Sequence, residues 1–150
     1  MLNLLDQFAL AHTQVTRLNA DLKEIVSPEQ KFSAKVELKL TPRNMAPDGE
    51  VPQYQVTARM VCQGYREGSE TSDPLFTVEL VLQAVYRQFR GETIAFEGFS
   101  ASHGSLTRQL YPLIHHQLKP VFKQFGLDQV KLPYDLPNHG SETAAQRQLH

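Results

Sequence analysis

The sequence predicts an α+β domain in which a four-stranded antiparallel sheet carries a C-terminal helix. Three segments, residues 32–41, 53–65 and 75–89, alternate apolar and polar residues, the period of strands with one buried and one wet face. A weaker segment of the same kind lies nearer the N-terminus. Residues 105–125 then place apolar side chains at steps of three and four, which predicts a helix with a broad apolar face. Such a helix needs a sheet to cover.

Composition and charge narrow the class of protein. The chain has 150 residues, 41% of them apolar and 21% charged, as in a single soluble globular domain. The net charge of -1 gives no electrostatic argument for nucleic acid, and no apolar run is long enough to span a bilayer. The start lacks the basic segment of a secretory signal. The lone Cys62 fits a reducing compartment and lies in a strand pattern, so we expect a cytoplasmic protein and a buried, unreactive thiol.

The N-terminal region is the most ambiguous part of the chain. Residues 1–8 suit either a short amphipathic helical turn or a lead-in to a strand, and for residues 1–14 the choice between helix and strand stays open. Alternation from Val15 to Ala20 favours a first strand within residues 9–25. A turn is expected at residues 27–30.

The next three strands follow clearly, separated by a Pro-rich loop at residues 42–52 and a polar turn at residues 66–74. In the last of them, Val81 and Val85 make the second face more apolar than a face left in water should be. We therefore expect that face to be covered, for example by another subunit. The apolar face of the first clear strand consists of Phe32, Ala34, Val36, Leu38 and Leu40.

The linker at residues 90–104 contains Phe96 and Phe99, which need a place to pack, either under the helix or at a binding surface. The helix is expected to begin near Ser105 as its N-cap. Pro120 falls inside it and should cost about 3 kcal/mol, which predicts a bend or split near that residue. Gly126 is placed to be its C-cap glycine. We assign residues 1–136 to the domain and the polar residues 137–150 to a flexible tail.

The sequence contains no convincing active site. His115 and His116 are adjacent, so on a helix they point about 100° apart and cannot chelate one metal ion together. No nucleophile elbow, zinc-protease or phosphate-loop motif occurs. Glu79 has no catalytic partner that the sequence can place beside it. We predict a protein that is not an enzyme and has no metal or cofactor.

The four predicted strands and a crossover segment are followed by a helix that carries Tyr111-Pro112, closes at Gly126-Leu127 and leads to the Leu-Pro pair within residues 130–133. This order of elements resembles the SecB export chaperone and its SecB-like relatives. Residues 36–40 resemble the family's second strand. Residues 76–86 resemble its fourth strand, with Glu79 at that strand's characteristic acidic position. The similarity spans residues 15–136, and Leu127-Asp128 replaces the usual Phe-Pro.

The resemblance implies a dimer of dimers that binds non-native polypeptide without ATP, keeping clients export-competent or protected from aggregation. It also implies that Glu79 contacts a partner and that Val81, Val85 and Tyr111 lie at the oligomer interface. For the strand residues among the implied groove positions, burial in the core is an equal alternative, and the two phenylalanines are either core or groove. The residues that the resemblance assigns to an apolar client groove are Val36, Leu38, Leu40, Phe96, Phe99, Leu127 and Leu132.

Two departures bear on the partner. Acidic members of the family dock the translocase motor ATPase through an acidic sheet surface, whereas this chain is nearly neutral and carries Lys35 and Lys39 on the outward face of a strand. A SecB-like chaperone that protects an antitoxin in a toxin–antitoxin system is therefore an alternative to an export chaperone. A further alternative is a small-ligand or partner-binding module on the same scaffold, with Phe96, Phe99 and Tyr111 as pocket walls.

Overall fold

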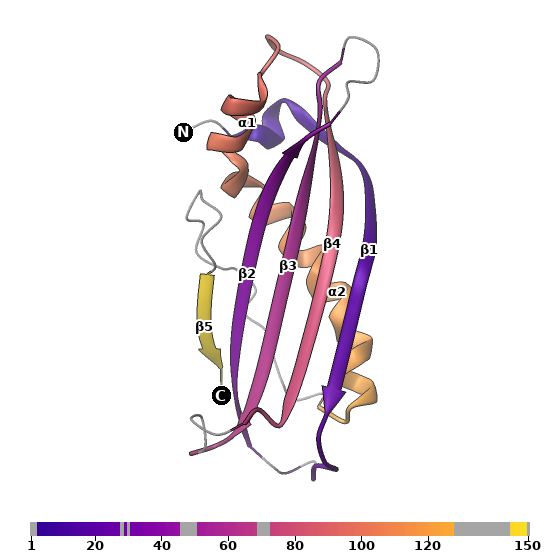
Figure 1. Cartoon of the computed structure of the whole chain (residues 1–150), viewed down its shortest axis with the longest axis vertical. Helices are drawn as coiled ribbons and strands as arrows, with labels where there is room; N and C mark the ends of the chain where they lie inside the picture. The colour runs from indigo at the N-terminus through magenta and orange to yellow at the C-terminus, as the bar shows by residue number, and fades with distance from the viewer. Residues whose placement is uncertain are drawn as a thin grey trace.

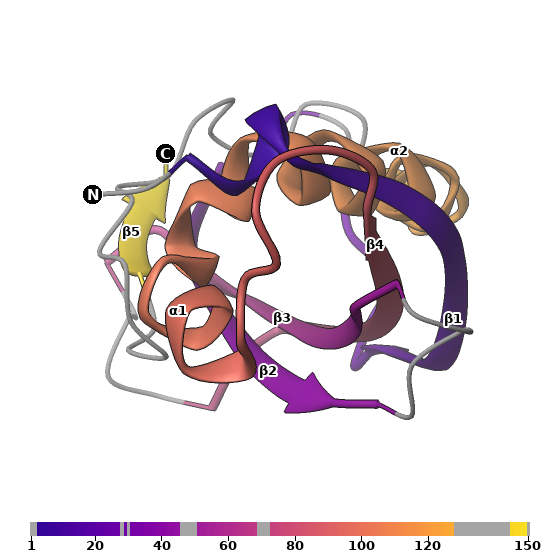
Figure 2. The ribbon, with the colours of Figure 1, turned by 90° about the horizontal axis from the view of Figure 1, so that it is seen from above.

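The computed structural model describes residues 3–27, 29, 31–45, 51–68, 73–127 and, for the backbone alone, 145–149. The four long strands, β1 (Phe8–Leu22), β2 (Phe32–Asn44), β3 (Gln53–Arg66) and β4 (Phe76–Gln88), form one antiparallel sheet. The strand order is β1-β4-β3-β2-β5, where β5 (Ala145–Leu149) is a short fifth strand. Helices α1 (Phe96–Ala101) and α2 (Thr107–Gln124) lie on one face of the curved sheet (Figures 1 and 2). The predicted fold class is confirmed.

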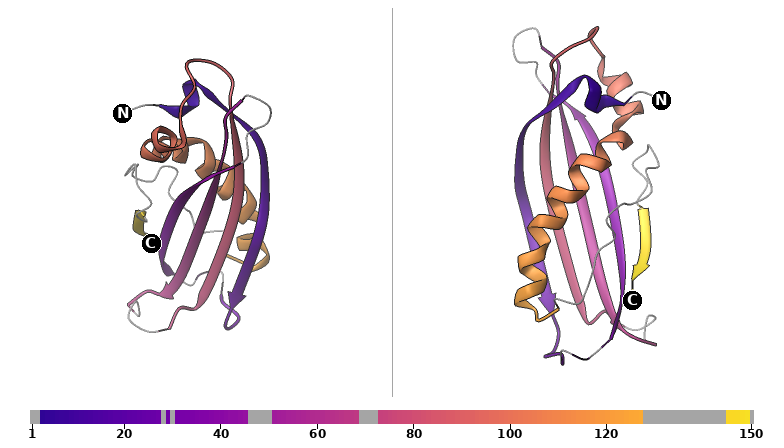
Figure 3. Two further views of the ribbon diagram at one scale, coloured as in Figure 1. Left: turned by 45° about the horizontal axis from the view of Figure 1, so that its top comes forward. Right: turned by 180° about the vertical axis from the view of Figure 1, so that it is seen from behind.

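The hydrophobic core lies between the sheet and helix α2, where the buried face of the strands contacts the apolar face of the helix. Alternate residues of β2, β3 and β4 point toward the helices and are buried, which is why these strands alternate in sequence. The helix α2 crosses this face diagonally and buries residues at steps of three and four (Figure 3). From α2 the core receives Leu110, Tyr111, Ile114, Leu118 and Phe122.

The N-terminal ambiguity is resolved into a turn and a strand. A 3-10 turn, η1 (Leu4–Asp6), precedes β1, which begins at Phe8. The expected helical turn and the expected lead-in to a strand therefore both occur before Phe8. The first strand is confirmed and pairs along its whole length with β4. Register shifts between Leu10 and His12 and between Val15 and Arg17 interrupt its alternation, because each irregularity moves the following residues to the other face. These shifts explain the weak sequence signal.

The predicted Pro-rich loop begins too early. Strand β2 continues through Pro42 to Asn44, and Pro42 pairs with Val56 of β3. Strand β5 pairs with β2 only from Ala34 to Leu38, so at Pro42 β2 is an edge strand among the described residues. A proline is tolerated on an edge strand because no neighbouring strand lies on the open side to accept a hydrogen bond from the N–H that proline lacks.

The predicted linker at residues 90–104 contains a helix. Helix α1 and a 3-10 turn, η2 (His103–Leu106), precede α2, and Ser105 lies inside η2 instead of capping a helix. The Ser105 N-cap prediction is therefore wrong. Its hydroxyl accepts a hydrogen bond from the Leu4 amide at 3.2 Å and donates one to the Ser102 carbonyl at 2.8 Å. Ser105 thus ties the N-terminal turn to the start of the helical layer.

Helix α2 runs through both of its prolines, so the predicted split at Pro120 does not occur. The buried face on either side of Pro120, including Leu118 and Phe122, packs on the sheet and offsets the lost backbone bond. The Gly126 prediction is confirmed. With a φ of 75°, Gly126 ends the helix as its amide bonds to the Lys123 carbonyl, while the Leu127 amide bonds to the Phe122 carbonyl.

The C-terminal residues predicted to form a flexible tail include a strand that the sequence did not predict. Residues 145–149 pair antiparallel with β2 (Figure 1). The predicted flexibility of residues 137–144 and His150 lies outside the described residues, as does the predicted groove residue Leu132.

Candidate functional site

The residues assigned to a client groove lie mostly in the core. Phe96 is only partly buried, whereas the other described members of the set are at most 5% exposed. A client could contact those buried side chains only after the helices had moved away from the sheet. In the structure as described, burial in the core therefore fits these residues better than lining of a client groove. The buried members are Val36, Leu38, Leu40, Phe99 and Leu127.

An aromatic cluster fixes α1 to the sheet. The Phe99 ring lies 5.1 Å from Phe8, 4.7 Å from Tyr54 and 6.2 Å from Tyr86, so it joins strands β1, β3 and β4. Phe96 forms the outer margin of the cluster, 5.7 Å from Tyr54. Because Phe99 is fully buried here, it does not form the wall of an open pocket.

Gln88 holds the crossover segment between β4 and α1. Its side-chain amide donates to the carbonyls of Arg90 and Glu92 at 3.0 and 2.6 Å, and its oxygen accepts from the Ile94 amide at 3.0 Å. The Tyr54 hydroxyl donates to the Ile94 carbonyl at 2.5 Å, and burial raises the pKa of that hydroxyl. Sequence reasoning missed Gln88. One signal for it was present in the sequence. Gln88 follows Tyr86 by two residues, so it is a polar residue at the next buried position of the β4 alternation.

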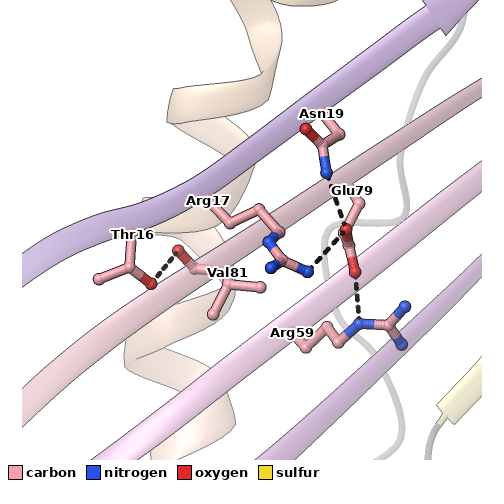
Figure 4. Close-up of polar contacts among 6 residues, drawn as sticks. All are labelled: Thr16, Arg17, Asn19, Arg59, Glu79 and Val81. Carbon is pink, nitrogen blue, oxygen red and sulfur yellow. Dashed lines mark hydrogen bonds and ion pairs between the residues drawn. The ribbon is translucent and has the colours of Figure 1, made fainter.

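Glu79 is the centre of a polar network on the open face of the sheet (Figure 4). One carboxylate oxygen accepts from Arg59 Nε at 2.6 Å. The other accepts from Asn19 Nδ2 at 3.3 Å and lies 3.9 Å from an Arg17 nitrogen. The hydrogen bond from Arg59 is the main cause that lowers the Glu79 pKa below its ordinary value, with Asn19 and Arg17 adding to it. Side chains of β1 and β3 therefore already neutralise the residue expected to contact a partner.

Basic side chains gather around this network. The register places Arg17, Val81, Arg59 and Lys39 in one row across β1, β4, β3 and β2. The neighbouring row holds Asn19, Glu79, Val61 and Glu37. Three cations against two carboxylates do not make an acidic surface. This part of the face lacks the feature through which acidic SecB proteins are expected to dock the translocase motor.

The three residues expected at an oligomer interface do not form one surface. Val81 and Val85 are half-buried on the open face of the sheet. Tyr111 is buried under α2 on the other face, with its ring 6.5 Å from that of His115. A partner subunit placed on the open face would reach the two valines and not Tyr111.

Partly exposed apolar side chains line the other side of the molecule, where the C-terminal half of α2 lies beside β1 (Figure 3). Leu18 of β1 is 47% exposed, and Val121 and Phe125 of α2 are only partly buried. Within the described residues, no strand pairs with the outer edge of β1. Apolar surface and an open main-chain edge therefore occur together. The remaining partly buried apolar residues on β1 are Leu10, Val15 and Leu22.

Little in the described part of the chain suggests covalent or metal chemistry. Burial raises the pKa of the Cys62 thiol to about 12, so it is protonated and unreactive at neutral pH. No group of three or more His, Cys, Asp or Glu residues in the described ranges is arranged to hold a metal ion. Among those residues there is also no helix with the length and apolar character needed to cross a membrane.

Replacing Glu79 by glutamine is expected to change the pH dependence of stability. Because the folded-state pKa is lowered, the carboxylate stabilises the fold above its ordinary pKa of 4.5 and loses this contribution as the pH falls through the lowered value. Since its partner arginines are largely exposed, we expect E79Q to cost less than about 1 kcal/mol at pH 7 and nothing near pH 2. Urea unfolding across this pH range measures the difference. E37Q, on the same face, is the control, and an equal pH effect in E37Q would refute the assignment.

Comparison with known proteins supports the fold. No family model matches the chain, and no curated protein matches it in sequence. Among solved structures, the chain is similar to the Rv1957 SecB-like chaperone of Mycobacterium tuberculosis, in complex with a ChAD peptide from the Rv1956 HigA1 antitoxin. The TM-score is 0.63 at 16% sequence identity, and the match covers 87% of this chain and 92% of the other. The fold of this protein is thus SecB-like, as the sequence predicted.

Proposed function

We propose that this protein is an ATP-independent chaperone that binds non-native polypeptide and protects it from aggregation. The observation that carries the proposal is the similarity of nearly the whole chain to a SecB-like chaperone that holds a peptide. At 16% identity this likeness concerns the fold, so the activity is inferred together with the surfaces described above.

The physical support comes from the partly exposed apolar surface where the C-terminal half of α2 lies beside β1, which we call the flank. Burial of apolar surface there by a client would contribute about 25 cal/mol per Å² to the binding free energy, and this contribution depends little on the client's sequence. An open strand edge adds main-chain hydrogen bonds that any extended segment can make. Among the predicted groove residues, we propose direct client contact for Phe96, because it is the described one that is partly exposed. Val36, Leu38 and Leu40 would then support the β2 edge from inside.

We favour a dedicated client over a broad set of export precursors. The similar structure was solved with an antitoxin peptide, and the charge rows around Glu79 give no acidic surface for a translocase motor. The function that fits both observations is protection of an aggregation-prone partner such as an antitoxin, in the cytoplasm. We further propose a homo-oligomer, a dimer of dimers, that covers Val81 and Val85 on the open sheet face.

Suppression of aggregation without nucleotide is the expected result. Light scattering of a chemically unfolded protein diluted into buffer should fall when this protein is added, and size exclusion with light scattering should show an oligomer. L18K should weaken the suppression severalfold, because it places a charge on the exposed apolar flank. Q14K, an exposed change on the same strand, is the matched control.

Two results would contradict the proposal. One is a monomer that leaves the aggregation rate unchanged. The other is release of a bound apolar dye by one compact ligand but not by unfolded chain, which would favour the small-ligand module.

A further inference from the structure

The outer face of α2 carries a stripe of basic side chains. At 100° per residue, these side chains occupy about 100° of the helix circumference and extend over about 22 Å of its axis. The helix lies on the outside of the sheet, so this side of it is turned away from the core (Figure 3). Four of the five residues are exposed, and His115 is partly buried. The basic stripe consists of Arg108, His115, His116, Lys119 and Lys123.

The basic stripe has no acidic counterpart on its own helix. The sequence of α2 contains no Asp or Glu, so the usual opposite-charge pairs between residues four apart cannot form there. None of the ion pairs between described residues involves the four exposed members of the stripe. The pKa of His115 lies below its ordinary value, first because of burial and then because of the charges of Lys119 and His116. The described part of the protein therefore leaves the positive charge of the stripe uncompensated.

This arrangement does not serve the stability of the helix. Lys119 and Lys123 are four residues apart, a spacing at which like charges repel each other. Arg108 lies in the first turn, where the helix dipole favours acidic side chains. A helix shaped for packing alone would gain stability from acidic residues at these positions. The stripe suits a ligand that supplies the missing negative charge.

We propose that the basic stripe is a docking site for an acidic polypeptide segment. In the chaperone proposed above, on which this assignment of the partner rests, the segment belongs to the client and lies beside its apolar residues. Leu113 is 37% exposed and lies three residues from His116, so it offers an apolar contact next to the stripe. An extended segment of about seven residues would span the stripe.

Other anionic or basic occupants fit the stripe less well. Single-stranded nucleic acid binds by stacking on exposed aromatic rings, whereas Tyr111 and Phe122 of α2 are buried. The chain's net charge of -1 also gives no general attraction for a long polyanion. A lipid surface would need the apolar face of α2, which is packed on the sheet. The α2 helix of a second copy would place cations against cations.

Peptides that differ only in charge test the inference on the full chain. The probe is a fluorescent seven-residue peptide in which glutamate alternates with valine, and its two counterparts carry glutamine or lysine in place of glutamate. At low ionic strength we expect the glutamate peptide to bind about tenfold more tightly than the glutamine peptide, and the lysine peptide to bind more weakly than both. The preference should shrink in about 0.5 M salt, because the contacts are exposed. Fluorescence anisotropy measures the affinities.

Three variants locate the site. R108Q/K119Q/K123Q should lose the preference for glutamate while remaining at least as stable as wild type in urea, because it removes repulsion between like charges. The matched control is K31Q/K39Q/R43Q, which removes the same charge from exposed positions on or beside β2 and should keep the preference. K119E/K123E should favour the lysine peptide over the glutamate peptide.

The outcomes separate this inference from the chaperone function. Suppressed aggregation without a preference for the glutamate peptide would overturn the docking site and leave the chaperone proposal standing. An equal loss in the two triple variants would also overturn the site, because net charge and not its position would then govern binding. Tighter binding of a seven-nucleotide oligothymidine would replace the acidic polypeptide by nucleic acid. If the stripe variants behave as expected while aggregation is not suppressed, the docking site stands and the chaperone proposal fails.

Discussion

Replacing Gly64 by alanine is expected to lower the free energy of unfolding by about 3 kcal/mol or more. Gly64 lies in β3 opposite Phe76 of β4, and a Cβ atom at Gly64 would overlap one edge of the Phe76 ring, 1.9–2.5 Å from three of its carbon atoms. The ring has no room to retreat, because it is fully buried between Phe32, at 6.2 Å, and Phe122 of α2, at 5.8 Å. Either the ring or the strand must shift, and both are packed on several sides. Urea unfolding at pH 7 measures the loss.

The matched control is G98A, at an exposed position of helix α1. There the added Cβ would meet only the Ile94 side chain, at 3.2 Å, and removing a helical glycine gains up to about 1 kcal/mol. The double variant G64A/F76L should be less destabilised than the sum of its single changes, because the smaller side chain relieves the overlap. A loss below about 1 kcal/mol in G64A would show that the sheet accommodates the methyl group and that Phe76 is not clamped.

Replacing Phe99 by alanine is expected to cost about 3–5 kcal/mol, the usual range for removing a buried phenylalanine. Its ring contacts rings from β1, β3 and β4, so the cavity would open where three strands and α1 meet. We expect the change to loosen α1 more than α2, because Phe99 is the fully buried side chain of that short helix. Urea unfolding measures the total loss, and amide hydrogen exchange locates it.

F96A is the control, since it removes the same ring from a partly exposed site of the same helix. We expect it to cost less than half as much as F99A and to leave exchange in α2 unchanged. If F96A and F99A destabilised the protein equally, the burial that distinguishes the two phenylalanines would not govern their contributions. If F99A left exchange in α1 unchanged, the aromatic cluster would not be what anchors this helix.

The elements that the sequence predicted well are those whose burial repeats with a regular period. Strands β2, β3 and β4 are buried on one face without interruption, and α2 carries one continuous apolar stripe. Two register shifts blurred β1. Helix α1 was missed because its six residues, which include Gly98 and Ser100, are too few to display a helical period. Strand β5 was missed because its residues are mostly polar and its partner lies about a hundred residues away.

The candidate site was less predictable, because it depends on which residues become neighbours across strands. The period of β2 predicts that Val36 is covered but not what covers it, so core and groove could not be separated from sequence. The bond from Asn19 to Glu79 joins residues 60 positions apart and requires the register of β1 on β4. The same holds for Arg59, on the opposite side of Glu79. The sequence pattern of each strand does not determine which residues of two strands lie opposite each other.

The pairing of β1 with β4 also has a consequence for synthesis of the chain. The two strands pair from Phe8↔Gln88 to Leu22↔Phe76, so among the described strands β1 has no partner until β4 has been translated. At about 5–20 residues per second, the ribosome needs roughly 3–13 s to proceed from Leu22 to Gln88. During that interval the nascent chain carries a fifteen-residue segment whose strand partner within the described residues, β4, does not yet exist. A protein proposed to shield the unpaired strands of others therefore leaves one of its own unpaired while it is being made.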